Sequence, residues 1–126
     1  MGDALPLHAG CGRLLLAFAP EPVQMLVLAG RLARFSPATI TNPRRLAAEI
    51  PIIRQRGWFT SQDELVPGSV AFSAPIRDAS GRASWMLTIS CPTIVAPGTE
   101  RRMLLRSVIA AAEELTGLAT TTAAAP

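Results

Sequence analysis

Hydroxyl groups and small side chains alternate with apolar side chains along two predicted strands, residues 69–76 and 83–90. A strand directs successive side chains to opposite faces of its sheet, so each face collects every second residue. One face collects Ser69, Ala71, Ser73, Ser84, Met86, Thr88 and Ser90. These side chains are mostly too small to fill space, and their hydroxyl groups can donate or accept hydrogen bonds. The pattern indicates the floor of a ligand pocket, and a solvated sheet face is the alternative that it leaves open.

The opposite face of the same two strands is apolar and is predicted to be core. It collects Val70, Phe72, Ala74, Ile76, Trp85, Leu87 and Ile89. The turn at residues 78–81 joins the two strands into an antiparallel hairpin.

The start of the first predicted helix, residues 10–19, offers a second group of hydrogen-bond donors. Gly10 and Gly12 have no side chains, so backbone N–H groups at this helix end can approach a small anion closely. A thiolate nucleophile at Cys11 is an alternative hypothesis. It lacks an evident base, because His8, the only histidine, is close in sequence to Cys11 and is expected to be capped or solvated.

The composition limits the class of protein. A chain of 126 residues fits one domain, and 49% apolar residues indicate that part of the surface meets another subunit. No apolar run is long enough to span a membrane, and the N-terminus lacks the features of a secretory signal, so we expect a cytoplasmic protein. Cys11 and Cys91 are too far apart in the sequence to form a zinc-binding pair, so we expect neither a metal nor a cofactor.

The basic residues do not indicate nucleic-acid binding. All 12 are arginines, and they are scattered along the chain. Nucleic-acid binding usually concentrates basic charge on one face and combines it with a recognisable reading motif. The sequence has no such motif, which argues against direct DNA binding by this chain.

The remaining elements follow from helix start and stop signals. They are helices over residues 21–29, 43–56 and 99–116, and a short strand over residues 58–61. Asn42 before Pro43 is a strong helix start. Gly117 is predicted to end the last helix, so residues 118–126 are expected to form a disordered tail.

Six short segments follow one another in a distinctive order. They are PLHAGCGRLLLAF (6–18), TITNP (39–43), IRQRGW (53–58), DELVPG (63–68), API (74–76) and ISCP (89–92). Together these segments resemble the effector-binding domain of IclR-type transcriptional regulators, over about residues 5–115.

The resemblance implies an α+β, GAF-like fold in which helices flank an antiparallel sheet. It also implies that one sheet face holds a small organic molecule. Carried over position by position, the family's ligand contacts fall on Gly10, Cys11, Ser61, Ser69, Ala71, Thr88 and Ser90. The implied partners are a small organic acid effector and further copies of the chain, in a dimer or tetramer. DNA would be bound only through a winged helix-turn-helix.

The sequence also departs from the family pattern. The winged helix-turn-helix and the first strands of the effector domain are absent, so residues 1–117 are expected to form a partial domain that lacks its leading strands. A sheet edge exposed in this way favours association. Arg13 stands where lysine is usual, Ser61 where some members have an acidic residue, and Cys91 where glycine is usual. These differences leave the identity of the effector open.

Two hypotheses for the function follow. In the first, the chain senses a small carboxylate, held by the backbone N–H groups of Gly10 and Cys11 and by the hydroxyl groups of Thr88 and Ser90. In the second, it is an oligomerisation module that binds no ligand. No enzymatic activity is expected.

Overall fold

The computed structural model describes residues 5–95 and 97–124, and from residue 119 onward it describes the backbone alone. The elements, in chain order, are α1 (Gly12–Phe18), α2 (Glu21–Ala29), α3 (Pro43–Arg56), β1 (Phe59–Gln62), β2 (Ser69–Arg77), β3 (Ala83–Pro92), the 3₁₀ turn η1 (Thr93–Val95) and α4 (Gly98–Ala124). Every helix and strand expected from the sequence is present.

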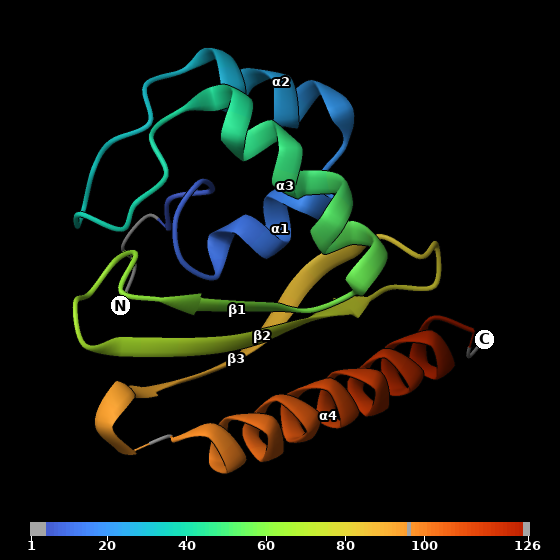
Figure 1. Ribbon diagram of the computed structural model, residues 1–126. Helices are drawn as coiled ribbons and strands as arrows, with labels where there is room; N and C mark the ends of the chain where they lie inside the picture. The colour runs from blue at the N-terminus through green and yellow to red at the C-terminus, as the bar shows by residue number, and fades with distance from the viewer. Residues whose placement is uncertain (1–4, 96, 125–126) are drawn as a thin grey trace.

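The strands form one antiparallel sheet in the order β1-β2-β3. Helices α1, α2 and α3 lie on one side of this sheet, and α4 lies across the other side (Figure 1). The predicted α+β class and the flanking of the sheet by helices are therefore confirmed.

The sheet face toward α4 forms one hydrophobic core. Val70, Phe72 and Ala74 of β2 are buried there with Val108 and Ala112 of α4. The partly buried residues that pack against them include Ile76, Leu87 and Ile89. The alternation of side chains along the hairpin predicted this core because both strands are regular over most of their length.

Trp85 was predicted to lie in this core, and that prediction was wrong, because its side chain is 72% exposed. The strand pairing shifts register between Ile76 and Arg77. Ala83 is buried in the core on the opposite side of the sheet, although strict alternation would put it on the same face as Trp85. An irregularity of this kind interrupts the alternation that the prediction assumed.

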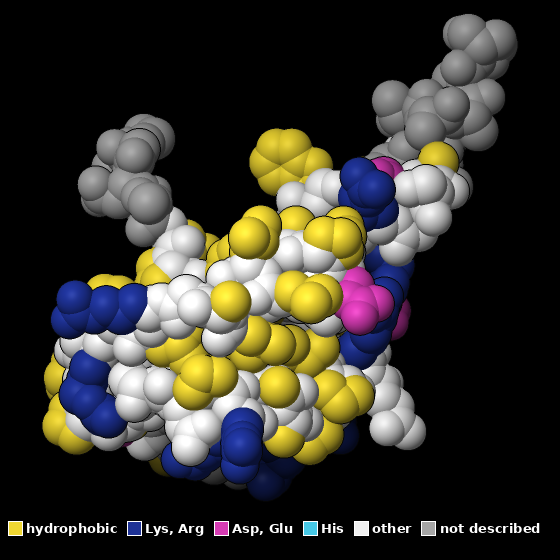
Figure 2. Space-filling view, turned by 90° about the horizontal axis from the view of Figure 1, so that it is seen from above, with side chains coloured by type: hydrophobic (Ala, Val, Ile, Leu, Met, Phe, Trp, Pro, Cys, Tyr) yellow, Lys and Arg dark blue, Asp and Glu magenta, His cyan; other side chains and the backbone are white. Residues whose placement is uncertain are grey.

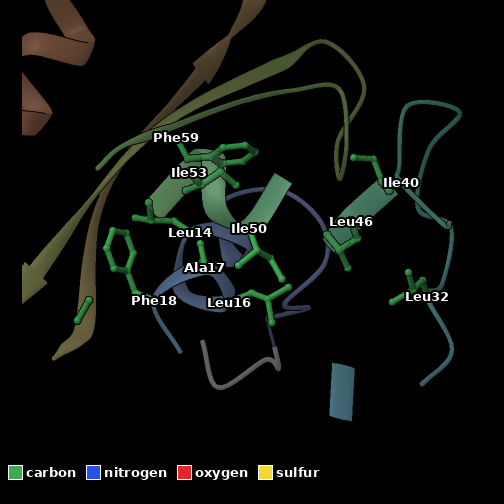
Figure 3. Close-up of a cluster of buried hydrophobic side chains, with 11 residues drawn as sticks. Leu14, Leu16, Ala17, Phe18, Leu32, Ile40, Leu46, Ile50, Ile53 and Phe59 are labelled. Atoms are coloured by element: carbon green, nitrogen blue, oxygen red, sulfur yellow. The ribbon is translucent and has the colours of Figure 1, made fainter. Parts of the chain in front are cut away.

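A second core lies between α1, α3 and the other face of the sheet. Its main members are Leu14, Leu16, Ala17 and Phe18 of α1, Leu46, Ile50 and Ile53 of α3, and Phe59 of β1. Figure 3 shows Leu14, Leu16 and Ala17 of α1 near the centre of this group, with Ile50 and Ile53 of α3 beside them. Ser73 of β2 is fully buried on this face. The solvated-face alternative is therefore excluded for the part of the sheet under these helices.

The capping signals of α3 are confirmed. Asn42 Oδ1 accepts hydrogen bonds from the backbone N–H groups of Arg44 and Arg45, at 2.9 and 3.4 Å. Gly57, at the other end, has a φ of 81°, a left-handed conformation that favours glycine.

The end of α4 differs from the prediction, because the helix continues through Gly117 to Ala124. A glycine inside a helix costs only about 1 kcal/mol relative to alanine, and several alanines follow it. The predicted end at Gly117 was therefore wrong. Of the predicted disordered tail, residues 125 and 126 lie outside the described residues.

The outer surface of the helical layer is partly apolar. Figure 2 looks down on this layer and shows apolar side chains gathered near the centre, with arginine side chains around them. Helix α2 buries none of its residues. Met25 and Leu26 of α2 and Ile52 of α3 are exposed by 63%, 76% and 51%. A surface of this kind is available for contact with another protein.

Candidate ligand-binding site

A cavity of about 120 Å³ lies where the small side chains of the sheet meet the loop before α1 and the turn after β1. Its lining consists of Gly10, Cys11, Ser61, Asp63, Glu64, Leu65, Val66, Ser69, Ala71, Thr88 and Ser90. All seven residues selected from the sequence border this one cavity. Their role in ligand binding stays a prediction.

The floor of the cavity is a row of small residues that runs across the three strands. Ser61 of β1 pairs with Ala71 of β2, which pairs with Ser90 of β3. The hydroxyl oxygens of Ser69 and Ser90 are 3.4 Å apart. Because the middle residue of the row has only a methyl side chain, space remains above the sheet.

The rest of the predicted floor has other roles. Thr88 lines the cavity and donates a hydrogen bond from Oγ1 to Ser73 Oγ at 3.3 Å. Met86 packs against the core under α1, and Ser84 is exposed. Only one half of this sheet face is therefore open to a ligand.

Gly10 and Cys11 form a second wall, just before α1. The helix begins at Gly12, later than predicted, so both residues precede it. No hydrogen bond joins either of their N–H groups to another described residue. These two N–H groups are therefore available donors.

The structure explains why glycine is required at two positions of this loop, which the sequence alone did not show. Gly10 has a φ of 60°, and a Cβ atom on it would lie 2.5 Å from Leu65 Cδ1. A Cβ atom on Gly12 would lie 2.0 Å from the carbonyl oxygen of Pro6. Close packing accounts for both glycines without a bound anion.

The third wall is the turn after β1. Asp63 has a φ of 62°, and its Oδ1 accepts a hydrogen bond from the N–H of Gly68 at 2.7 Å. Thr39 Oγ1 donates to the carbonyl oxygen of Glu64 at 2.6 Å, and Ser36 Oγ donates to that of Asp63. The loop before α3 therefore holds this turn in place.

A buried ion-pair network contacts the Glu64 side chain of this turn. Arg13 donates to Glu64 Oε1 and, at 2.6 Å, to Glu49 Oε2. It also donates twice to the carbonyl oxygen of His8. Ser61 Oγ donates to Glu64 Oε2 at 3.0 Å. Burial lowers the pKa of the Arg13 guanidinium and Glu49 opposes this shift, but arginine stays protonated at any ordinary pH.

The sequence predictions missed the residues that form this turn wall and its support. Asp63, Glu64, Leu65 and Val66 were noted only as a family-like segment, and the acidic pair in it was the available signal. Arg13 was noted only as a replacement for lysine. Its partner Glu64 is 51 positions away, a contact that no local pattern contains.

A second, larger hollow is less suited to an acid. It has a volume of about 470 Å³, lies between α3 and β1 and is more open to solvent. Its lining is strongly charged and includes Arg13, Arg45, Glu49, Arg56 and Glu64. Glu64 therefore separates this hollow from the smaller cavity.

The remaining candidate groups have simpler roles. His8 is buried, and its Nε2 lies 2.8 Å from the carbonyl oxygen of Ala33, which confirms the capped alternative. Cys11 and Cys91 are free thiols. No cluster of three or more metal-ligating side chains occurs in the part of the chain that the structure describes.

The family model described as "Bacterial transcriptional regulator IclR C-terminal" matches residues 1–116. The chain belongs to this family. The GAF-like prediction is thereby confirmed, and the chain corresponds to the effector-binding domain of IclR regulators.

Individual relatives agree with this assignment. The HTH-type transcriptional regulator BhcR of Paracoccus denitrificans is 35% identical over 116 residues. A crystal structure of an IclR regulator from Silicibacter sp. TM1040 matches with a TM-score of 0.88 at 26% identity, and covers 95% of this chain and 49% of that one. The inducer-binding domain of PobR from Acinetobacter, solved as a double mutant in complex with 3-hydroxybenzoic acid, matches with a TM-score of 0.78 at 27% identity. The match covers 94% of this chain and 69% of that one.

The chain spans less than half the length of its curated relatives. The match to BhcR, for example, covers 90% of this chain and 42% of the relative. These relatives are transcriptional regulators, in agreement with the prediction that the chain is not an enzyme. Among the described helices, none is both long and apolar enough to cross a membrane.

Proposed function

We propose that this IclR-family domain binds a small organic acid in the cavity between β2, β3 and the loop before α1. The observation that carries the proposal is the convergence on one cavity of hydroxyl groups from the sheet and unpaired N–H groups from the loop. Ligand sites are clefts or cavities in which a few placed polar groups fix the orientation of the ligand.

The donors suit an acid. The N–H groups of Gly10 and Cys11 can donate to one carboxylate oxygen, and the hydroxyl groups of Ser69 and Ser90 can donate to another. Hydrogen bonds to an ionised acceptor are roughly twice as strong as neutral ones. A carboxylate therefore gains more from these groups than a neutral ligand does.

The volume favours a short ligand. A cavity of 120 Å³ has room for about four waters at roughly 30 Å³ each, and a cavity of about 150 Å³ holds benzene. The cavity as it stands therefore fits an acid of about five or six non-hydrogen atoms, such as glyoxylate or pyruvate. PobR is seen with 3-hydroxybenzoic acid, which supports organic acids as a class. An acid of that size would extend from the open side of the cavity, where Ser90 is exposed.

In a complete regulator, the bound acid would act by population shift. A ligand changes an equilibrium only by its differential affinity for two states. We infer that effector binding biases the arrangement of subunits and, through it, the affinity of a winged helix-turn-helix for DNA. The family's members regulate bacterial transcription, so we place this action in the cytoplasm.

The test is calorimetric titration of the purified chain with glyoxylate, pyruvate and 3-hydroxybenzoate. We expect saturable binding of at least one of the two short acids. A chain that unfolds cooperatively on heating, and is therefore folded, but shows no heat with either acid would refute the proposal.

Self-association without a ligand is the second candidate, favoured by the exposed apolar side chains of α2. Met25 and Leu26 of α2 are exposed, and a second copy of the chain, as a dimer or tetramer, could cover them. Sedimentation at several concentrations tests this. An oligomer that Leu26→Asp dissociates supports it, and a monomer at every concentration contradicts it.

A further inference from the structure

The charge of the side chains that line the cavity is unfavourable for binding an acid. Of its described lining residues, Asp63 and Glu64 carry negative charge and none carries positive charge. A carboxylate ligand would therefore approach two carboxylates of the protein. If the cavity binds an acid, another group of the protein must lower this repulsion.

The two carboxylates differ in their surroundings. Asp63 is half-buried, and one of its oxygens already accepts a hydrogen bond from Gly68. Glu64 is only 8% exposed. Charges at a wet rim are screened by water, whereas charges away from water interact much more strongly. The charge of Glu64 is therefore the one that matters for a ligand in the cavity.

Arg13 compensates that charge from behind. Its side chain is 3% exposed and contacts Glu64 directly, yet Arg13 does not line the cavity. The second carboxylate on Arg13, that of Glu49, faces the larger hollow, which Arg45 and Arg56 also line. Arg13 and Glu64 thus present a nearly neutral wall to the cavity.

The same network fixes the role of Ser61. Its hydroxyl hydrogen is donated to Glu64 Oε2, so its oxygen offers only lone pairs to a ligand. A carboxylate gains nothing from a lone pair. The donors that remain for an acid are the N–H groups of Gly10 and Cys11 and the hydroxyl groups of Ser69 and Ser90, because Thr88 Oγ1 donates to Ser73.

We propose that Arg13 is the positioning residue that makes this cavity selective for anionic ligands, by neutralising Glu64 and by directing the Ser61 hydroxyl away from the ligand. The inference rests on the proposed function. It assigns the selectivity to a residue that never touches the effector.

The test compares an acid with its neutral isostere. Pyruvate and pyruvamide have the same shape, and the ratio of their dissociation constants reports charge selectivity apart from stability. Arg13→Met should weaken the binding of pyruvate at least about tenfold more than the binding of pyruvamide. This corresponds to a difference in binding free energy of about 1.4 kcal/mol or more. Arg13→Lys should keep the ratio near that of the wild type, and Arg13→Met combined with Glu64→Gln should restore it.

Loss of one partner of a buried ion pair can prevent folding, so Glu64→Gln alone provides a second test. This substitution keeps the shape of the side chain and removes its negative charge. We expect it to strengthen the binding of pyruvate relative to that of pyruvamide at least threefold. Glu21→Gln on α2, exposed and remote from the cavity, makes the same charge change and should leave the ratio unchanged.

The outcomes separate the two proposals. Wild type that binds pyruvate, with a ratio that neither Arg13→Met nor Glu64→Gln alters, overturns the role of Arg13 and leaves the proposed function standing. Wild type that is folded and binds neither pyruvate nor glyoxylate overturns the proposed function, and the inference with it.

Discussion

The side chain of Leu65 occupies the space beside Gly10, where a Cβ atom would lie 2.5 Å from Leu65 Cδ1 and 3.0 Å from its Cγ. Two segments that are distant in the sequence therefore meet at the cavity, and each limits the other. Gly10 also has a positive φ of 60°. The contact places the backbone N–H groups of the loop at one wall and an aliphatic side chain at the next.

Gly10→Ala should destabilise the fold and distort the cavity. The left-handed conformation costs a non-glycine residue about 1–2 kcal/mol, and overpacking against Leu65 adds about 1–3 kcal/mol. Gly81→Ala is the matched control, because Gly81 has a φ of 82° and nothing within 4 Å of an added Cβ. Urea unfolding should show the larger loss for Gly10→Ala. Equal losses of unfolding free energy in the two variants would mean that the Leu65 side chain moves aside without destabilising the fold.

Ser90→Ala should weaken binding of a short acid by about tenfold, the effect of one lost hydrogen bond to a charged group. Ser84→Ala provides the control, since Ser84 is on the same strand but outside the cavity. Calorimetric titration of both variants with pyruvate measures the difference. If Ser90→Ala binds as tightly as Ser84→Ala, the strand hydroxyl does not hold the ligand.

Leu65→Ala should change the size limit of the cavity. Removing most of this side chain enlarges the space, so 3-hydroxybenzoate should gain affinity relative to pyruvate. Val66 also lines the cavity but is 63% exposed, so Val66→Ala should have a smaller effect. Titration with both acids gives the two affinity ratios. An aromatic acid that binds the wild type as tightly as pyruvate would contradict the size argument.

The hairpin turn should respond to acid. The hydrogen bond from Ser80 Oγ, at 2.5 Å, is the main cause that lowers the pKa of Asp78, and the N–H groups of Ser80 and Arg82 add to it. A carboxyl with a lowered folded pKa stabilises the fold above its unfolded pKa, and this contribution is lost as the pH falls through the folded pKa. NMR titration of Asp78 should show a low pKa that moves back toward the ordinary value in Ser80→Ala. An unchanged pKa in that variant would assign the effect to the backbone.

The sheet and half of the cavity could be predicted from local patterns. Alternation along β2 and β3 identified Ser69, Ala71, Thr88 and Ser90 because a regular strand fixes which side chains share a face. The same rule was wrong for Trp85, where the register shift interrupts the alternation. Local rules hold only as far as the local geometry stays regular.

The charged wall could not be predicted, because it depends on contacts between distant segments. Arg13 meets Glu64 and Glu49 only after α1, α3 and the turn after β1 have packed together. The end of α4 was missed for a different reason. A single glycine was treated as a stop signal, but a glycine also tolerates helical geometry, at a cost of only about 1 kcal/mol relative to alanine.

The most direct test of the proposed site is an NMR titration of the isotope-labelled chain with pyruvate. We expect saturable shifts of the backbone amides of Gly10, Cys11, Ala71 and Ser90, with little change on α2. Saturable shifts confined to other surfaces, or none at all in a folded chain, would contradict the assignment of this cavity as the acid-binding site.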